Sequence, residues 1–121
     1  MNRDEREAAL LNWGARSYHI EIKNGVVSHK TGRGPVAGAR AMIETSGSIQ
    51  RRLSATRLVL LGPFALAFLK SKDNRSLWLT IVGDTFEILA ELPPKHEAQA
   101  RQWATRFNNL AMSLAQQAGA L

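Results

Sequence analysis

The sequence contains no cysteine, which excludes disulfide bonds and every metal site built from thiolates. It also lacks a long apolar segment. The longest uncharged apolar run covers residues 58–69, is too short to span a bilayer and is interrupted by Gly62 and Pro63. No apolar segment follows the charged residues near the N-terminus, as a secretory signal would require. Together these absences predict a soluble protein of a reducing compartment, which we assign to the cytoplasm.

Catalytic motifs are missing as well. His19, His29 and His96 are far apart and have no carboxylate at a helical ligand spacing. No serine lies in a nucleophile elbow, and no carboxylate pair is placed for acid–base catalysis. The glycine-rich residues 32–38 match neither the P-loop nor the dinucleotide-binding fingerprint, so we interpret them as a structural loop. We therefore predict that the protein is not an enzyme and has no cofactor and no metal ion.

What the chain does have is an uneven excess of positive charge. Its 121 residues include 16 Lys and Arg against 10 Asp and Glu, a formal net charge of +6. Residues 23–75 alone, with ten basic and two acidic side chains, carry +8. Such a segment attracts acidic proteins, anionic membranes or nucleic acids, although the same charge also serves solubility alone. The predicted basic binding face consists of Lys30, Arg33, Arg40, Arg51, Arg52, Arg57, Lys70, Lys72 and Arg75.

A long helix is predicted near the C-terminus, because residues 95–118 repeat apolar side chains with the spacing of an amphipathic helix. Pro93 and Pro94 suit its start, Glu97 suits its first turn and Gly119 suits its end. This helix needs an apolar partner surface, which the preceding strands supply. The predicted apolar stripe consists of Ala100, Trp103, Ala104, Phe107, Leu110, Ala111, Leu114, Ala115 and Ala118.

A short helix is predicted over residues 2–13, where Asn2 and Glu5 fit a capping box. We expect Leu10 and Trp13 of this helix to face a core. Trp78 is expected to be covered by Trp13 or by another subunit. Any part of this apolar surface that stays exposed would mark a partner site. The candidate apolar interface consists of Leu10, Trp13 and Trp78.

Between the two helices, apolar and polar residues alternate in short segments separated by turn signals. Asn24-Gly25 is the strongest hairpin signal among them. We interpret residues 28–35 as a polar loop and residues 55–56 as a turn or a bulge. This order predicts an α+β fold with about seven antiparallel strands in a barrel or sandwich. The predicted strands cover residues 16–23, 26–27, 36–45, 49–53, 57–61, 64–70, 76–82 and 86–91.

Several short motifs accompany this order of elements. They are Gly32-Arg33-Gly34-Pro35-Val36-Ala37-Gly38-Ala39, Glu44-Thr45-x-Gly47, Thr56-Arg57, Leu69-Lys70-Ser71-Lys72 and Arg106-Phe107-Asn108-Asn109. With them, the chain resembles the bacterial pleckstrin-homology-like (PH-like) domains that are common in actinobacteria and their phages. The resemblance covers roughly residues 16–115. It implies two near-orthogonal antiparallel sheets with one open end plugged by the C-terminal helix. We accordingly expect an N-terminal helical extension over residues 1–15 and a PH-like domain over residues 16–121.

The resemblance also implies a function. PH-like folds bind peptides and self-associate, so we predict a non-catalytic adaptor that contacts another protein or a second copy of this chain. Two alternatives stay open, namely a peripheral binder of anionic membrane lipids and a non-specific binder of nucleic acid. A fold alone does not decide among these functions, because one fold hosts many of them.

Overall fold

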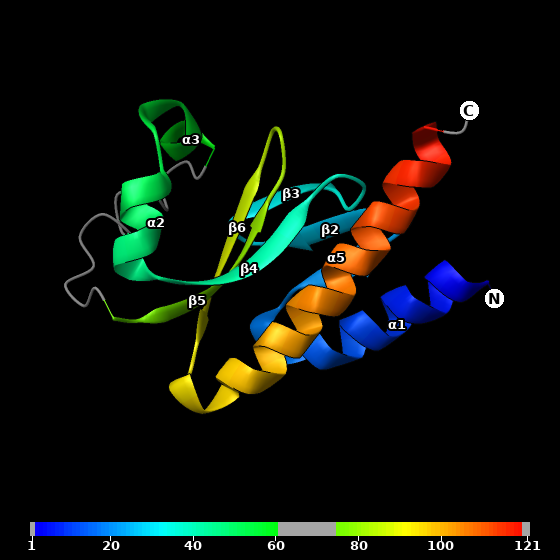
Figure 1. The fold of residues 1–121 in the computed structure, drawn as a ribbon, viewed down its shortest axis with the longest axis horizontal. Helices are drawn as coiled ribbons and strands as arrows, with labels where there is room; N and C mark the ends of the chain where they lie inside the picture. The colour runs from blue at the N-terminus through cyan, green and yellow to red at the C-terminus, as the bar shows by residue number, and fades with distance from the viewer. Residues whose placement is uncertain (1, 61–74, 120–121) are drawn as a thin grey trace.

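The computed structural model describes residues 2–60 and 75–119 of the chain. These residues form an α+β fold with an N-terminal helix, six antiparallel strands in two sheets, and a long C-terminal helix that packs on the sheets (Figure 1). The predicted fold class is confirmed at this level. None of the helices within these two ranges has the length and apolarity that crossing a membrane requires.

The first sheet has the order β1-β2-β3, with β1 (Glu21–Lys23), β2 (Val26–His29) and β3 (Gly32–Pro35). Asn24 and Gly25 join β1 to β2 with φ angles of 52° and 76°. Two consecutive positive φ angles are typical of the tight turns that match the twist of a hairpin. The predicted hairpin is therefore confirmed. The expected strand over residues 16–23 is shorter, because its first residues form a 3-10 turn.

The second sheet has the order β4-β5-β6, with β4 (Arg40–Thr45), β5 (Leu77–Val82) and β6 (Glu87–Leu92). The strands predicted over residues 76–82 and 86–91 are confirmed to within a residue or two at each end. The strand predicted over residues 36–45 begins only at Arg40, because Gly38 turns the backbone with a φ angle of 79°.

Residues 28–35, predicted to be a loop, instead form the end of β2, a turn at Lys30 and Thr31, and all of β3. The glycines are explained by close packing between the two sheets. A Cβ atom at Gly32 would overlap with the carbonyl oxygen of Glu87, and one at Gly34 would overlap with the ring of Phe86. At the same junction, the Leu89 backbone N–H donates to the Thr31 hydroxyl at 3.0 Å. Glycine is required here because β3 crosses β6 with no room for a side chain.

The strands predicted over residues 49–53 and 57–61 are wrong, because helices α2 (Ser46–Arg52) and α3 (Ala55–Val59) lie there. The Thr45 hydroxyl accepts the backbone N–H of Ser48 at 3.1 Å, and the Ser54 hydroxyl accepts that of Arg57 at 3.2 Å. These are N-cap hydrogen bonds, which satisfy amides at a helix start. The two caps turn the chain into helices at the positions where strands were expected. The strand predicted over residues 64–70 lies outside the described residues.

The C-terminal helix α5 (Glu97–Gly119) follows the 3-10 turn η2 (Pro94–His96) and covers one face of the second sheet. Its stripe is confirmed over the first four turns, whereas Leu114 and Ala115 are half-buried and Ala118 is exposed. The core lies between this helix and the inner faces of both sheets, which include Val27, Leu79 and Ile88. The buried stripe residues are Ala100, Trp103, Ala104, Phe107, Leu110 and Ala111.

The N-terminal helix α1 (Arg3–Ala15) runs beside α5 and joins the same core (Figure 1). Its predicted capping box is present. Leu11 and Ala15 are the residues it buries, and the Trp103 indole N–H donates to the Leu11 carbonyl at 2.9 Å. The expectation that Leu10 and Trp13 face the core is therefore wrong.

Two asparagines close the edges of the sheets. The Asn12 amide in α1 donates to the Ile22 carbonyl of β1 at 2.7 Å, and its side-chain oxygen accepts the Ile22 N–H. In α5, Asn108 makes the same pair of bonds with Ala41 of β4, at 3.0 and 2.7 Å. Each amide thus occupies backbone groups that would otherwise be open to an added strand.

Candidate binding surfaces

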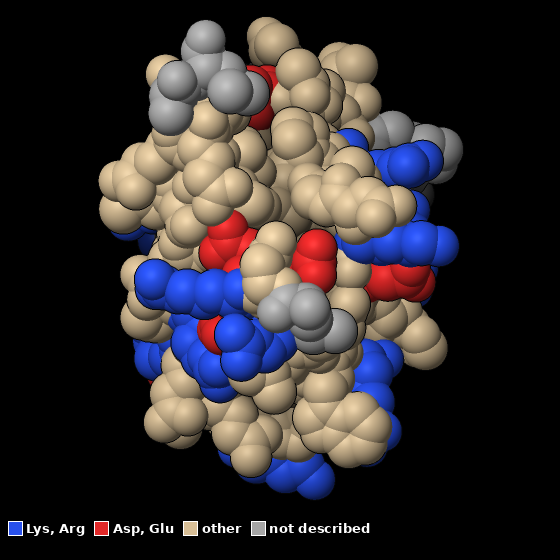
Figure 2. Space-filling model, turned by 90° about the vertical axis from the view of Figure 1, so that its right-hand side faces the viewer, with Lys and Arg blue, Asp and Glu red and all other residues tan. Residues whose placement is uncertain are grey.

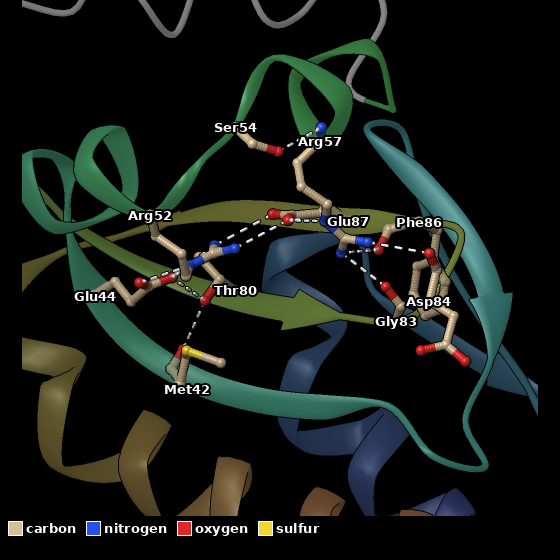
Figure 3. A network of polar contacts seen from close by, with 10 residues as sticks. All are labelled: Met42, Glu44, Arg52, Ser54, Arg57, Thr80, Gly83, Asp84, Phe86 and Glu87. Atoms are coloured by element: carbon tan, nitrogen blue, oxygen red, sulfur yellow. Dashed lines mark hydrogen bonds and ion pairs between the residues drawn. The ribbon is translucent and has the colours of Figure 1, made fainter.

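A network of charged side chains lies between the second sheet and the helices α2 and α3 (Figure 3). Glu87 is its centre, with a side chain that is 0% exposed. Arg52 donates to Glu87 at 2.9 Å and Arg57 donates to it at 3.0 Å. Glu44 accepts from Arg52 at 2.9 Å and from the Thr80 hydroxyl at 2.8 Å. Two buried carboxylates are thereby matched with two guanidinium groups, as a low-polarity interior demands.

Both arginines of this network are used inside the molecule. Arg57 also donates to the backbone carbonyl oxygens of Gly83, Asp84 and Phe86, at 2.7, 3.1 and 3.3 Å. Burial lowers the pKa of Arg52, but its hydrogen bonds to carboxylates outweigh burial and raise that pKa above the ordinary arginine value. The prediction that Arg52 and Arg57 belong to a binding face is therefore corrected, because their guanidinium groups are committed to internal partners.

The other predicted basic residues lie at the surface. Lys30, Arg33, Arg40 and Arg51 are exposed, and none forms an ion pair with the residues that the structure describes. Arg75 is exposed too and has an interaction of its own. Two further members of the predicted face, Lys70 and Lys72, lie outside the described residues.

The exposed basic residues do not converge on one patch. Arg40 begins β4, whereas Arg51 lies in α2, beyond the other end of that six-residue strand (Figure 1). Such a strand spans about 17 Å. Figure 2 shows Lys and Arg atoms in several separate groups on one side of the molecule, with Asp and Glu atoms among them. The basic middle of the sequence is thus distributed over the fold.

Trp78 does not belong to an exposed interface. It is buried against Ile49 of α2 and Leu89 of β6, and its indole N–H donates to the Ser46 hydroxyl at 2.7 Å. The prediction that Trp13 or another subunit covers Trp78 is therefore corrected. The short helix α2, which the sequence did not indicate, supplies the cover.

Leu10 and Trp13, in contrast, are exposed on α1. Leu10 is 54% exposed and Trp13 is 67% exposed. The Arg16 guanidinium lies over the Trp13 ring, 3.6 Å from its centre. At an exposed site, a cation over an aromatic face contributes about 0.5–1 kcal/mol. This contact favours the orientation in which Trp13 is presented to solvent.

Three arginines complete this surface, and the sequence reasoning missed them. We call it the α1 stripe; it has three positive charges and no acidic member. All of its residues are exposed. Their spacing of three or four positions places them on one side of a helix, opposite Leu11 and Ala15. This spacing is the sequence signal from which the arginines could have been assigned to one surface. The α1 stripe consists of Arg3, Arg6, Leu10, Trp13 and Arg16.

A depression of about 540 Å³ adjoins the end of the α1 stripe. Arg16 lines one part of it, and Glu21 and Lys23 of β1 line another. His19 and Asn12 also border it. The depression connects the α1 stripe to the first strand, where Glu21 and Lys23 contribute one charge of each sign.

The histidines have separate structural settings. His29 accepts the Thr31 backbone N–H on Nδ1 at 3.2 Å, and burial lowers its pKa. Nδ1 of His96 lies 2.5 Å from the Tyr18 hydroxyl. Within residues 2–60 and 75–119, no group of three His, Cys, Asp or Glu side chains is placed to hold a metal ion.

Comparison of the chain with protein-family models, with curated proteins and with solved structures found no match.

Proposed function

We propose that the protein is a non-catalytic module of the PH-like type that acts by binding another protein through the α1 stripe. The PH-like assignment is supported by the two antiparallel sheets, by the close crossing of β3 over β6 and by the long helix α5 across the core. This assignment names one family within the α+β class, and the choice of that family rests on the sequence motifs.

The observation that carries the proposed function is the exposure of Leu10 and Trp13. The opposite side of α1 already packs into the core, through Leu11 and Ala15. Fully burying a large apolar side chain contributes roughly 1.5–3 kcal/mol. Leu10 is 54% and Trp13 is 67% exposed, so a partner that covers them can gain the part of this free energy that the fold leaves unused. One side of α1 therefore carries a driving force for association.

A rigid support makes the α1 stripe suitable for a protein partner. Arg106 of α5 donates to Glu7 at 2.8 Å, and Ser113 donates to Asp4 at 3.3 Å. Together with the buried Leu11, these contacts fix α1 against α5. Tryptophan and arginine on a fixed support are the residues that most often dominate the binding energy of protein interfaces.

An anionic membrane is the second candidate, because the α1 stripe also combines arginines with apolar side chains. Helices that lie in a membrane surface bury a broad apolar face in the lipid. The apolar face of α1 is already used by the core, and only Leu10 and Trp13 remain outside. This favours a protein pocket over a lipid surface.

The proposal is tested with a variant that removes the exposed apolar groups, Leu10→Ser combined with Trp13→Ser. Tagged wild-type protein and variant are used to capture proteins from a native lysate, followed by quantitative mass spectrometry. Met112→Ser is the matched control, because Met112 is also apolar and is 61% exposed, but lies on α5. We expect a set of proteins that the wild type and Met112→Ser retain and the double variant loses.

Identical captured sets for all three proteins would contradict the proposal. A parallel arm measures sedimentation with phosphatidylglycerol vesicles at low salt. If the double variant loses vesicle binding while its captured proteins are unchanged, the surface belongs to the membrane candidate. Light scattering of the pure protein separates self-association from binding to a different protein.

A further inference from the structure

The α1 stripe has a charge pattern that specifies the chemistry of its partner. From the arrangement of Trp13 and Arg16 we infer that the stripe binds an acidic, amphipathic helical segment of another protein, in which carboxylates flank an apolar face. This inference rests on the proposed function and adds the partner class to it.

The first step is the charge of the surface. Arg3, Arg6 and Arg16 are exposed, and none of them forms an ion pair with the residues that the structure describes. Among the carboxylates of α1, Asp4 and Glu7 are engaged with α5, and Glu5 accepts the backbone N–H of Asn2 in the capping box. Three unpaired cations on one side of a helix attract an anionic partner and oppose a basic one.

A second copy of this chain is a poor partner by the same reasoning. The chain has a net charge of +6, and the exposed carboxylates among the described residues are scattered over different elements. They are Glu5, Glu21, Asp84 and Glu91. Two copies facing each other across the α1 stripe would bring six arginines together, and like charges at an interface are costly. The partner is therefore a different protein.

The second step is the geometry of the Arg16 side chain. Its guanidinium carbon lies over the Trp13 ring, 3.6 Å from the ring centre. A guanidinium that contacts a ring through its flat face keeps the N–H groups at its edge free to donate. A planar fork of N–H donors matches the two oxygens of a carboxylate. An acidic residue that contacts Arg16 thus lies directly beside the apolar residues that cover Trp13.

The third step is the spacing along the helix. Arg6 and Arg16 are ten positions apart and lie on either side of Leu10 and Trp13. With a rise of 1.5 Å per residue, the two arginines are about 15 Å apart along the axis. A partner helix that contacts both of them has carboxylates separated by about three turns, with apolar residues between them.

The experiment uses the full chain and three synthetic helical peptides of equal length, each labelled with fluorescein. The acid–apolar peptide has glutamates about three turns apart and leucines between them on the same face. In the acid–polar peptide the leucines are replaced by glutamine, and in the base–apolar peptide the glutamates are replaced by lysine. Binding is measured by fluorescence anisotropy, and vesicles of phosphatidylglycerol form a fourth arm.

We expect the wild type to bind the acid–apolar peptide at least about tenfold more tightly than either other peptide. Trp13→Ala and Arg16→Gln should each weaken this binding by about tenfold or more, as hot-spot residues do. Arg16→Lys should also weaken it, because lysine lacks the planar fork. Arg40→Gln is the matched control and should change nothing, since Arg40 is an exposed arginine at the start of β4, whereas α1 packs mainly against α5 and β1.

Tryptophan emission gives an independent readout. Of the three tryptophans, Trp78 and Trp103 are buried in the free protein, so a blue shift on binding reports Trp13. The shift should be present with the acid–apolar peptide and absent in Trp13→Phe. Thermal unfolding of each variant should match the wild type, because every substituted side chain is exposed.

Three results would overturn the inference. The first is equal affinity for the acid–apolar and acid–polar peptides, which would mean that charge alone accounts for binding and that the apolar residues contribute nothing. The second is binding to vesicles that depends on Trp13 while no peptide binds. The third is no binding of the acid–apolar peptide at all; if stripe-dependent capture from the lysate persists in that case, the partner class is wrong and the proposed function stands. If neither peptide binding nor stripe-dependent capture is found, the inference and the proposed function are both overturned.

Discussion

The two faces of the second sheet are covered in different ways. On one face, Leu79, Ile81 and Ile88 pack against Phe107 and the other apolar residues of α5. On the other face, the carboxylates of Glu44 and Glu87 bind arginines from α2 and α3, beside a small cluster around Trp78 (Figure 3). Apolar packing is non-directional, whereas the charged network depends on particular donors meeting particular acceptors.

This contrast teaches that burial alone does not indicate how a surface responds to substitution. On the apolar side, removing atoms leaves a cavity whose cost grows with its size. On the charged side, removing one partner of an ion pair leaves the other charge buried and uncompensated in a low-dielectric environment. The same sheet therefore supports two kinds of test, and their results should differ in kind as well as in size.

The largest expected effect is on the apolar face. Phe107→Ala removes a fully buried ring that stacks on Trp103 with 5.3 Å between ring centres. We expect the free energy of unfolding to fall by about 3–5 kcal/mol, as for other buried phenylalanines. Urea denaturation followed by circular dichroism measures it. Phe107→Leu should cost clearly less, because it leaves a smaller cavity; equal losses for both would mean that packing volume does not control this face.

The next effect tests the charged face. Arg52→Met removes the guanidinium group that joins Glu44 to Glu87 and keeps most of the side-chain volume. Breaking a buried pair costs about 3–5 kcal/mol. Because the Arg52 side chain is 28% exposed, we expect about 2–3 kcal/mol, between the buried and surface cases.

A multiple substitution distinguishes the charged face from the apolar one. Replacing the whole group, with Glu44→Leu, Arg52→Met, Arg57→Met and Glu87→Leu, removes all four charges together. Apolar replacement of a complete buried ion cluster is often neutral or stabilising. We therefore expect the quadruple variant to be more stable than Arg52→Met alone. If it is less stable, the attraction within the network exceeds the desolvation cost of burying its charges, so the network stabilises the fold. The contrast between the two faces would then be weaker than described.

The apolar face was predictable from the sequence because its signal is repeated. The α5 stripe recurs over several turns, and every second residue of β5 and β6 on this face is apolar, from Leu77 to Ile81 and from Ile88 to Leu92. The Asn24-Gly25 hairpin was predictable because this dipeptide tolerates positive φ angles. The α1 stripe was missed because Leu10 and Leu11 are adjacent leucines, and the sequence alone does not indicate which of them is buried. Choosing Leu10 placed Trp13 in the core, whereas the structure buries Leu11.

The charged face could not be predicted in the same way. Ile49 and Leu53 are four positions apart, a spacing that fits one side of a helix and one side of a strand equally well. Only the caps at Thr45 and Ser54 separate the two cases, and each is a single residue. Arg52 meets Glu87, which is 35 positions away in the sequence. No local pattern encodes such a pair, so both arginines looked like surface residues.

A smaller effect is expected at the sheet edges, where polar groups complete the apolar side. Asn12→Ala and Asn108→Ala each expose one backbone N–H and one C=O of an edge strand. We expect each to lower the free energy of unfolding by about 1–3 kcal/mol, the usual cost of unpaired partly buried groups. Hydrogen–deuterium exchange should accelerate at Ile22 or Ala41 respectively. Asn109→Ala, on the exposed side of α5, is the control and should alter neither quantity.

The smallest expected effect is a pH dependence of the free energy of unfolding. It arises at His29, where the turn between β2 and β3 meets β6. His29 Nδ1 accepts the backbone N–H of Thr31, and the Thr31 hydroxyl accepts the backbone N–H of Leu89 in β6. Burial lowers the pKa of His29, and the positive charges of Lys30 and His19 lower it further. The unfolded chain therefore binds a proton near the usual pKa of about 6.5, whereas the folded protein resists it until lower pH.

Stability from this group is fully present above pH of about 6.5 and is lost as the pH falls from there through the folded-state pKa. Urea midpoints between pH 7 and 5 measure the loss, and His29→Gln should flatten the profile. Lys30→Gln removes a charge that lowers the pKa of His29, so it should bring that pKa nearer to its ordinary value and reduce the slope. Arg40→Gln should leave the slope unchanged, because Arg40 does not act on the imidazole. A slope that survives His29→Gln would show that His29 is not the source of the acid sensitivity.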